Sequence, residues 1–301
     1  MSLSWPERVR EISGRVREIS KRVREPLLRL RETPGRLIPR RLRIGLAPDR
    51  LLVATYSGFL RPALDAAETI PVSGRDLPPW RPAVDALPAA IAPHSSRKPQ
   101  TTVILSGHFV RYALLAPDPA LATAEEWLAY ARHRMEGVHG HAVAEWDLRV
   151  AETSRDGPRL ACAVDRALLE AVDARVAEAG AVLVSVQPYL MAAFNRVRAR
   201  LGGRSCWLAI AEPGRLALVL MQNGAWRSIR CRNVDEGWQH RLPEILARES
   251  AALALGQPCE DVIVVAPDTF DSEPEGSLRV RDLTLPRGAS QAHQSLAMVL
   301  P

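Results

Sequence analysis

The chain has 301 residues, 47% of them apolar, and a formal net charge of +6. This length and composition can supply the core of one large domain or two moderate ones, whereas the apolar runs are far too short to span a bilayer. Four scattered cysteines without a CxxC pair indicate neither a zinc site nor a disulfide framework, so a reducing cytosol is the expected compartment.

The positive charge is concentrated at the start of the sequence. Residues 1–43 hold 13 lysines and arginines against 5 glutamates, whereas the remaining residues hold 27 basic and 29 acidic side chains. A basic segment joined to a nearly neutral body predicts an anionic surface or partner for that segment. Because the body has no basic patch with interleaved aromatic residues, nucleic acid is disfavoured as a partner.

Residues 8–25 repeat an arginine-rich pattern every seven positions, as RVREIS, RVREIS and RVRE. Its apolar members recur at intervals of three and four, which predicts an amphipathic helix over residues 7–25. The apolar stripe and its flanking arginines are Val9, Ile12, Val16, Ile19 and Val23, with Arg8, Arg15 and Arg22. A segment containing proline and glycine, up to residue 41, is interpreted as a linker.

Two interpretations of this helix stay open, and two others are disfavoured. A parallel coiled coil would set arginine against serine across the seam and place isoleucine at d positions, which disfavours two strands. RNA binding lacks support because the repeat contains no aromatic side chain. A helix lying on an anionic membrane surface fits the stripe and its arginines, and a solvated basic tail fits equally well.

The body opens with a predicted β-hairpin over residues 42–57, which turns at Pro48-Asp49-Arg50. Strands are then predicted over 66–72, 101–106, 109–115, 142–150, 160–164 and 182–186. Helices are predicted over 84–91, 124–135, 166–179 and 188–201. Thr123 and Asp165 are placed as N-caps of two of these helices.

A second hairpin, over residues 207–221, begins the other half of the body. The further predicted elements are strand 226–230, helix 238–255, strand 262–266 and strand 278–283. Each half thus begins with strand–turn–strand and continues with strands and helices, which predicts a duplicated, two-lobed α/β fold. The predicted division is a basic helix and linker over 1–41, a first lobe over 42–200 and a second lobe over 201–301.

This duplicated pattern resembles the actin/hexokinase/Hsp70-like (ASKHA) superfamily. Three stretches resemble its assembly proteins of type IV pili and type II secretion, the PilM/GspL/MshI-like group: ILSGHFVRYALLAPD (104–118), LACAVDRALLEAVDARVAEAGAVLVSVQPYLMAAFNRVR (160–198) and WLAIAEPGRLALVLMQNGAWRSIR (207–230). The resemblance implies a cytoplasmic actin-like protein, peripheral to the inner membrane, that binds the short cytoplasmic tail of a single-span, PilN-like partner. It also implies ATP as the cofactor that some members bind between their lobes.

Nucleotide binding in this fold needs backbone N–H groups at both hairpin turns and a carboxylate that holds the metal. The candidate residues are Asp49, Glu212 and Gly214. Pro48 and Pro213, however, each remove a donor N–H from their turn, and Ala266-Pro267-Asp268 replaces the Gly-Gly that would hold an adenosine. We therefore expect a degenerate site without catalysis, in which Asp49 and Glu212 are ordinary turn carboxylates.

Two other constellations suggest chemistry but have ordinary explanations. His139 and His141 would share one face of a strand near His133, yet no third ligand stands at a strict spacing, so no metal site is predicted. The run Ser106-Gly107-His108 lacks a Gly-x-Ser-x-Gly elbow, and no catalytic residue is assigned. The tryptophans expected in the core are Trp127, Trp146, Trp207, Trp226 and Trp238.

Three functions follow from these observations. The favoured one is a non-catalytic actin-like scaffold that docks membrane-spanning partners of a type IV pilus or type II secretion-like assembly platform. A nucleotide phosphohydrolase or kinase of the same fold is the second, and the missing phosphate-turn glycines disfavour it. A membrane-surface or RNA-binding adaptor that acts through the basic segment is the third.

Overall fold

The computed structural model describes residues 41–58, 63–74, 78–152, 157–255, 259–267, 278–284 and 297–300. Residues 39–301 form one compact unit, and this unit is described by itself. The predicted helix over residues 7–25, with its proposed membrane or partner contacts, lies outside the described residues. Within the described part of the chain, no helix is long and apolar enough to cross a membrane.

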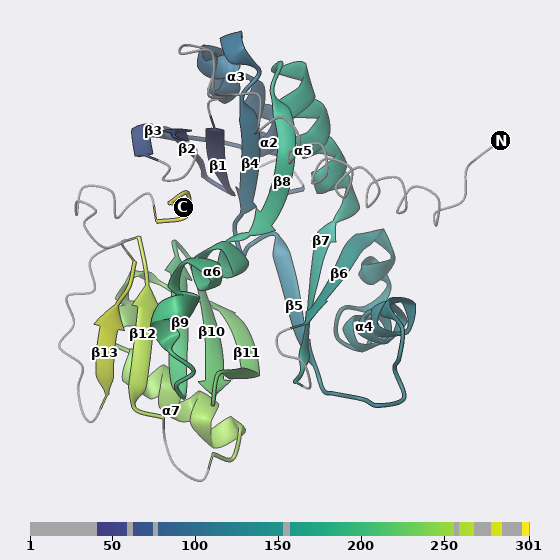
Figure 1. Cartoon of the computed structure of the whole chain (residues 1–301), viewed down its shortest axis with the longest axis vertical. Helices are drawn as coiled ribbons and strands as arrows, with labels where there is room; N and C mark the ends of the chain where they lie inside the picture. Colours follow the sequence, from purple (N-terminus) through teal and green to yellow (C-terminus); the bar gives the residue numbers. More distant parts are fainter. Residues whose placement is uncertain are drawn as a thin grey trace, which may run out of the picture. The chain divides into compact units, whose positions relative to one another are not determined.

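The first lobe is built on a five-stranded sheet in the order β3-β2-β1-β4-β8. Its strands are β1 (Arg41–Ala47), β2 (Arg50–Ser57), β3 (Ala63–Pro71), β4 (Gln100–Leu105) and β8 (Val182–Pro188). β1 pairs antiparallel with β2 and parallel with β4, and β4 pairs parallel with β8. The predicted hairpin over residues 42–57 is therefore confirmed, and it occupies the middle of this sheet (Figure 1).

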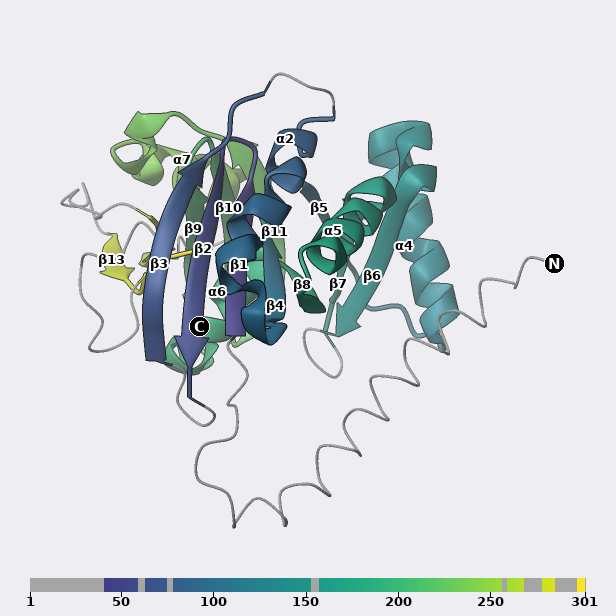
Figure 2. The same ribbon diagram turned by 90° about the horizontal axis from the view of Figure 1, so that it is seen from above.

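Helices cover both faces of this sheet. Successive side chains of each strand point to opposite faces, so the two faces contact different helices. On one face, Leu42, Ile44 and Leu46 pack against α2 (Arg81–Asp85), α3 (Leu87–Ile91) and α5 (Arg166–Glu178). Figure 2 shows α2 and α5 on this side of β1 and β4. On the other face, residues of β2 pack against α6 (Tyr189–Leu201).

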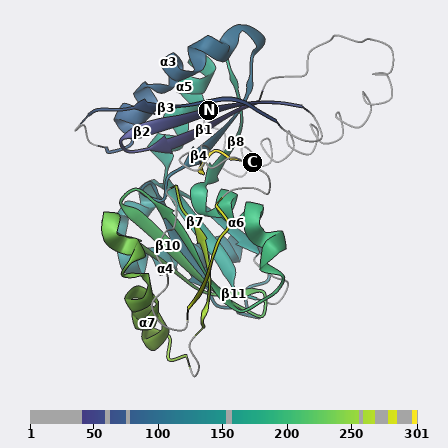
Figure 3. The same cartoon turned by 90° about the vertical axis from the view of Figure 1, so that its left-hand side faces the viewer.

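The second lobe repeats this architecture in a five-stranded sheet of order β11-β10-β9-β12-β13. Its strands are β9 (Cys206–Glu212), β10 (Arg215–Gln222), β11 (Ala225–Asn233), β12 (Asp261–Val265) and β13 (Arg279–Asp282). The hairpin β9–β10 is antiparallel and β12 pairs parallel with β9, as β4 does with β1. The two hairpins thus lie in separate sheets (Figure 3), and the predicted duplication is confirmed.

α6 lies between the two sheets and shares one hydrophobic core with both. Leu190, Ala193 and Val197 of this helix join a cluster that includes Ile104 of the first sheet and Ile210 of the second. α7 (Leu242–Ala252) packs on the opposite face of the second sheet, where Trp207 is completely buried. The predicted division near residue 200 falls at the end of α6, and its exact position stays a prediction.

A small three-stranded sheet, in the order β5-β7-β6, follows β4 in the chain. Its strands are β5 (Val110–Leu115), β6 (Trp146–Glu152) and β7 (Arg159–Asp165), and α4 (Ala124–His139) packs against it. α4 begins with a capping box in which the Thr123 side chain accepts from the N–H of Glu126, which offsets one orphan donor of the first turn. Trp127, Ala131 and Met135 form the buried stripe of this helix.

The structure corrects two predicted elements. The strand expected over residues 142–150 begins only at Trp146, because a 3-10 helix (Gly140–Glu145) precedes it. Gly140 has φ +65° and ends α4, in a conformation that glycine adopts at little cost. The helix expected over residues 238–255 is divided into a 3-10 turn (Glu236–Gln239) and α7, with Pro243 in the first turn of α7.

Residues Ala297–Leu300 return to the first lobe and are buried there. The hydroxyl of Tyr56 donates to the carbonyl of Val299 at 3.0 Å, and Nη1 of Arg196 donates to the carbonyl of Ala297 at 2.6 Å. Gly45 faces Met298 so closely that a Cβ on Gly45 would stand 2.6 Å from the Met298 sulfur. This segment therefore completes the α6-side core of the first lobe.

Candidate functional site

The two lobes meet where a nucleotide would need its phosphate contacts. Glu212, the last residue of β9, accepts two hydrogen bonds from the corner between β4 and β5. The Ser106 hydroxyl donates to Oε2 at 2.5 Å, and the Gly107 N–H donates to Oε1 at 2.6 Å. His108 Nε2 also lies 3.0 Å from the Pro213 carbonyl oxygen. We call these contacts the interlobe junction.

Small residues permit this close approach. A Cβ on Gly107 would stand 2.7 Å from Glu212 Oε1, so any larger side chain at this corner displaces the carboxylate. Gly214 has φ +75° in the β9–β10 turn, and its position faces the His108 ring. The junction therefore depends on a glycine from each lobe, one for space and one for backbone conformation.

The Glu212 carboxyl is poorly solvated in this setting. Burial raises its pKa, although the hydrogen bond from Ser106, the nearby His108 and the hydrogen bond from Gly107 act in the opposite direction. The interpretation of Glu212 as an ordinary turn carboxylate is therefore wrong. Its side chain joins the two lobes rather than facing solvent at the tip of the hairpin.

The other two candidate residues lie in the hairpin turns. Asp49 is exposed in the β1–β2 turn and pairs with the adjacent Arg50, with Oδ2 at 2.6 Å from Nη2. The hydrogen bond from Arg50 holds the pKa of Asp49 below its usual value. Among the described residues, no group of three or more histidine, cysteine, aspartate or glutamate side chains is arranged to hold a metal ion.

One cavity lies beside Glu212 at the interlobe junction. A cavity of about 40 Å³ is lined by Ala47, Arg50, Leu52, Tyr189, Ala211, Glu212, Pro213, Pro267 and Met298. Pockets that hold small molecules usually measure roughly 300–1,000 Å³, whereas one water needs roughly 10–15 Å³. This cavity has room for a few waters and none for a nucleotide. Two proline side chains and Met298 occupy its walls.

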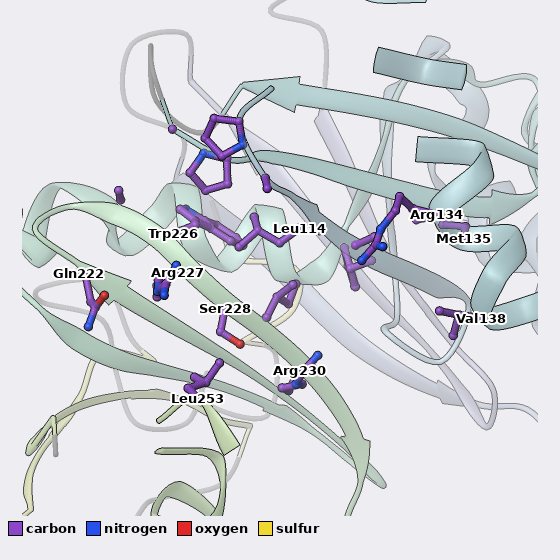
Figure 4. A pocket seen from close by; sticks show the side chains of 18 of the residues that line it. Leu114, Arg134, Met135, Val138, Gln222, Trp226, Arg227, Ser228, Arg230 and Leu253 are labelled. Atoms are coloured by element: carbon purple, nitrogen blue, oxygen red, sulfur yellow. The ribbon is translucent and has the colours of Figure 1, made fainter. Parts of the chain in front are cut away.

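A much larger pocket lies between the three-stranded sheet and the second lobe. Its volume is about 760 Å³, and its walls come from β5, α4 and the β10–β11 hairpin (Figure 4). β5 is an edge strand of the three-stranded sheet and β11 is an edge strand of the second-lobe sheet. We call this pocket the β5/β11 groove.

The β5/β11 groove combines apolar walls with positive charge. Its apolar lining includes Leu114, Met135, Val138, Trp226 and Ile229. Val138 is 77% exposed, although it is a large hydrophobic residue. Arg134, Arg227 and Arg230 also line the groove, and among the described residues no aspartate or glutamate does. Glu249 lies 3.7 Å from Arg230, which leaves the exposed Arg134 and Arg227 as the main cationic side chains.

Several residues on the inner side of the β5/β11 groove pack against the hydrophobic core. The Trp226 ring packs edge-on against Phe194 of α6 with 4.9 Å between centroids, and Trp226 is buried. Tyr112 of β5 and Cys231 of β11 both pack on the core around α6. The groove therefore lies on ordered elements, which hold a binding surface more exactly than mobile loops do.

The sequence did not predict the contacts of the interlobe junction or the β5/β11 groove. The groove residues come from segments near 112–139 and near 222–253, which the sequence gives no reason to join. The histidine cluster does not form on a strand, because His139 ends α4 and His141 lies in the following 3-10 helix. The His139 ring instead packs edge-on against Trp146 at 5.1 Å. Of the predicted core tryptophans, Trp127, Trp207, Trp226 and Trp238 are buried.

The duplicated sheets, the paired hairpins and the intervening α6 define an actin-like fold. Solved structures with the same fold include the PilM–PilN type IV pilus biogenesis complex, with 16% identity, a TM-score of 0.56, and 77% of this chain and 82% of that chain covered. The cytoplasmic domain of EpsL, an inner-membrane component of the type II secretion system of Vibrio cholerae, matches with 15% identity and a TM-score of 0.57, covering 85% and 92%.

A protein of unknown function with an actin-like ATPase fold, from Bacteroides thetaiotaomicron, matches with 10% identity and a TM-score of 0.52, covering 77% of this chain and 85% of that chain. No protein-family model matches the sequence, and no curated protein matches it either. The predicted duplicated actin-like fold is thus confirmed, and so is the predicted likeness to actin-like proteins of pilus and type II secretion assembly.

Proposed function

We propose that this protein is a non-catalytic actin-like scaffold of a type IV pilus or type II secretion-like assembly platform. The proposed absence of catalysis rests on the interlobe junction, where the Glu212 carboxylate accepts hydrogen bonds from Ser106 and Gly107. The fold shared with a PilM–PilN complex and with EpsL supports the assembly role. In this role the protein binds the cytoplasmic tail of a single-span inner-membrane protein.

The closed junction predicts that the protein does not bind Mg-ATP tightly. A nucleotide would have to displace Met298 and separate Glu212 from its two donors before it could enter the cavity of about 40 Å³. We expect titration calorimetry with the full chain to show no saturation below about 1 mM, which corresponds to roughly 4 kcal/mol of binding free energy. Micromolar affinity, or phosphate release above background, would favour a phosphohydrolase or kinase instead.

The β5/β11 groove is the proposed docking site for the partner tail. Among the described residues β5 and β11 are each the outermost strand of a sheet, and an extended peptide can add to such an edge through main-chain hydrogen bonds. The apolar walls would hold alternate side chains of that peptide. Because Arg134 and Arg227 are exposed, and the part of the lining that the structure describes contains no carboxylate, an acidic tail with apolar residues is the complementary occupant.

A charge reversal tests this docking site. Single-span membrane proteins that copurify with the full chain would be identified, and their tails synthesised as peptides. We expect the double variant Arg134→Glu, Arg227→Glu to bind an acidic tail about tenfold more weakly than the wild type does, since two favourable charge contacts become repulsive. Both residues are exposed, so the fold should tolerate their replacement.

Arg198→Glu is the matched control, because Arg198 is exposed on α6 and does not line the groove. Its affinity for the same peptide should equal that of the wild type. Equal binding by the wild type and the groove variant would exclude the β5/β11 groove as the docking site. Because Arg198→Glu reverses one charge and the groove variant reverses two, a loss of binding free energy half as large in Arg198→Glu would show that only the net charge of the protein matters.

A further inference from the structure

Two arginines on the α6 side of the first-lobe sheet have buried nitrogen atoms without hydrogen-bond partners. Arg43 is on β1 and Arg196 is on α6. Nε of Arg43, and Nε and Nη2 of Arg196, are buried and make no hydrogen bond of ordinary geometry, although the Tyr189 hydroxyl lies beside the Arg196 guanidinium. Nη1 of Arg196 donates to the Ala297 carbonyl. Buried donors in folded proteins are nearly always paired, so these nitrogen atoms need an acceptor such as a water or an anion.

The two guanidinium groups also lack a counter-charge. Burial lowers the pKa of Arg43, and the neighbouring charge of Arg196 lowers it further, whereas Tyr56 acts in the opposite direction. Among the described residues, no aspartate or glutamate forms an ion pair with Arg43 or Arg196. Two like charges close together in a buried setting cost free energy unless an anion compensates them.

A cavity opens beside Arg43. Its volume is about 290 Å³, near the lower end of the range for small-molecule pockets. The polar side chains in its lining are Arg41, Arg43, Tyr56, Gln100 and Thr102, and none of the described residues that line it is acidic. The Tyr56 hydroxyl already donates to the Val299 carbonyl. The Gln100 amide and the Thr102 hydroxyl can therefore supply neutral donors next to the Arg43 guanidinium.

We propose that this cavity is a binding site for a small oxyanion, a phosphate group or a carboxylate, held by Arg43 with Gln100 and Thr102. A guanidinium presents paired N–H donors that match two oxygens of either group. Arg196 contributes its positive charge without lining the cavity. This site lies on the first-lobe sheet and shares no lining residue with the β5/β11 groove, so it does not depend on the proposed docking of a tail.

The test compares the thermal stability of the full chain in phosphate, sulfate, acetate and chloride at matched ionic strength. A ligand that binds only the folded state stabilises it according to its concentration and affinity. For the wild type we expect a saturable rise in Tm of about 5–8 °C in phosphate or acetate at 100 times Kd, relative to chloride. A response to phosphate and sulfate identifies a tetrahedral oxyanion site, and a response to acetate identifies a carboxylate site.

Arg43→Met removes the charge and keeps a side chain of similar length. In chloride this variant should be at least as stable as the wild type, because it removes an uncompensated buried charge. It should lose the response to anions, whereas Arg248→Met, at an exposed position of α7 that lines neither pocket, should keep it. Arg43→Lys, which retains the charge but not the paired donors, should respond with an affinity about tenfold lower.

Calorimetry with inorganic phosphate and with acetate on the full chain gives an independent measure of binding. A saturable isotherm that Arg196→Met weakens would support the site even if Arg43→Met fails to fold. The proposal is overturned if the wild type and Arg43→Met gain the same stability in every anion. It is also overturned if no anion binds with a measurable isotherm.

Discussion

Replacing Glu212 by alanine is expected to lower the free energy of unfolding by about 2–4 kcal/mol. The change leaves the Ser106 hydroxyl and the Gly107 N–H without their acceptors at the interlobe junction. A buried donor that loses its acceptor costs roughly 1–3 kcal/mol. Urea unfolding followed by circular dichroism measures the difference, with a constant m-value as the sign that only stability has changed.

Glu212→Gln is the matched control for this variant. A glutamine retains one oxygen for the Gly107 N–H, and its amide can donate to Ser106, so we expect a loss below about 1 kcal/mol. If both variants lose less than about 1 kcal/mol, the two hydrogen bonds do not stabilise the junction. If glutamine loses as much as is expected for alanine, about 2–4 kcal/mol, the ionised carboxylate is required.

Because burial raises the pKa of Glu212, the difference in stability between the wild type and Glu212→Gln should depend on pH. At a pH between the usual value for glutamate and the raised value, the folded protein holds a proton that the unfolded chain has released. The contribution of Glu212 is therefore fully present at low pH and is lost as the pH rises through the folded pKa. Since Glu212→Gln has no such proton, its stability relative to the wild type should increase with pH over that window.

Replacing Trp207 by alanine should have the largest effect on stability, about 3–5 kcal/mol. Trp207 lies on β9 with its side chain completely buried against the core under α7. Removing an aromatic ring from such a site loses its transfer free energy and leaves a cavity. Chemical denaturation measures the loss, and an effect below about 1 kcal/mol would contradict the packing described for this sheet.

Trp207→Phe separates ring packing from the polar atom of the ring. The Trp207 Nε1 is buried without a hydrogen-bond partner, so a phenylalanine removes an unsatisfied donor along with part of the ring. We expect this variant to lose much less stability than the alanine variant does. A loss as large as that of alanine would indicate that Nε1 has a partner that stabilises the fold.

Local patterns were sufficient to predict most of the fold. The hairpin over 42–57 has a turn flanked by apolar strands, and β1 and β2 form there. Thr123 and Glu126 are three residues apart and form the capping box of α4. The repetition of strand–turn–strand in each half was sufficient to predict the duplication. In each case the controlling interactions join residues that are close in sequence.

The candidate sites could not be predicted in the same way, because they depend on contacts between distant residues. Ser106 and Glu212 are separated by 106 positions, and neither has a neighbour that indicates the other. Trp226 and Val138 line the same groove, but they are far apart in the sequence. The buried setting of Arg43 depends on the alternation of β1 and on α6, so composition alone places this arginine among ordinary surface charges.

Residues Ala297–Leu300 make the order of synthesis important for folding. They complete the core of the lobe that contains Tyr56, 243 positions earlier in the chain. At about 5–20 residues per second of translation, roughly 10–50 s pass between the synthesis of these two contacting residues. During this interval Gly45 lacks its contact with Met298, and the Tyr56 hydroxyl lacks its acceptor at Val299. The first lobe therefore reaches its complete packing only after residues 297–300 have left the ribosome.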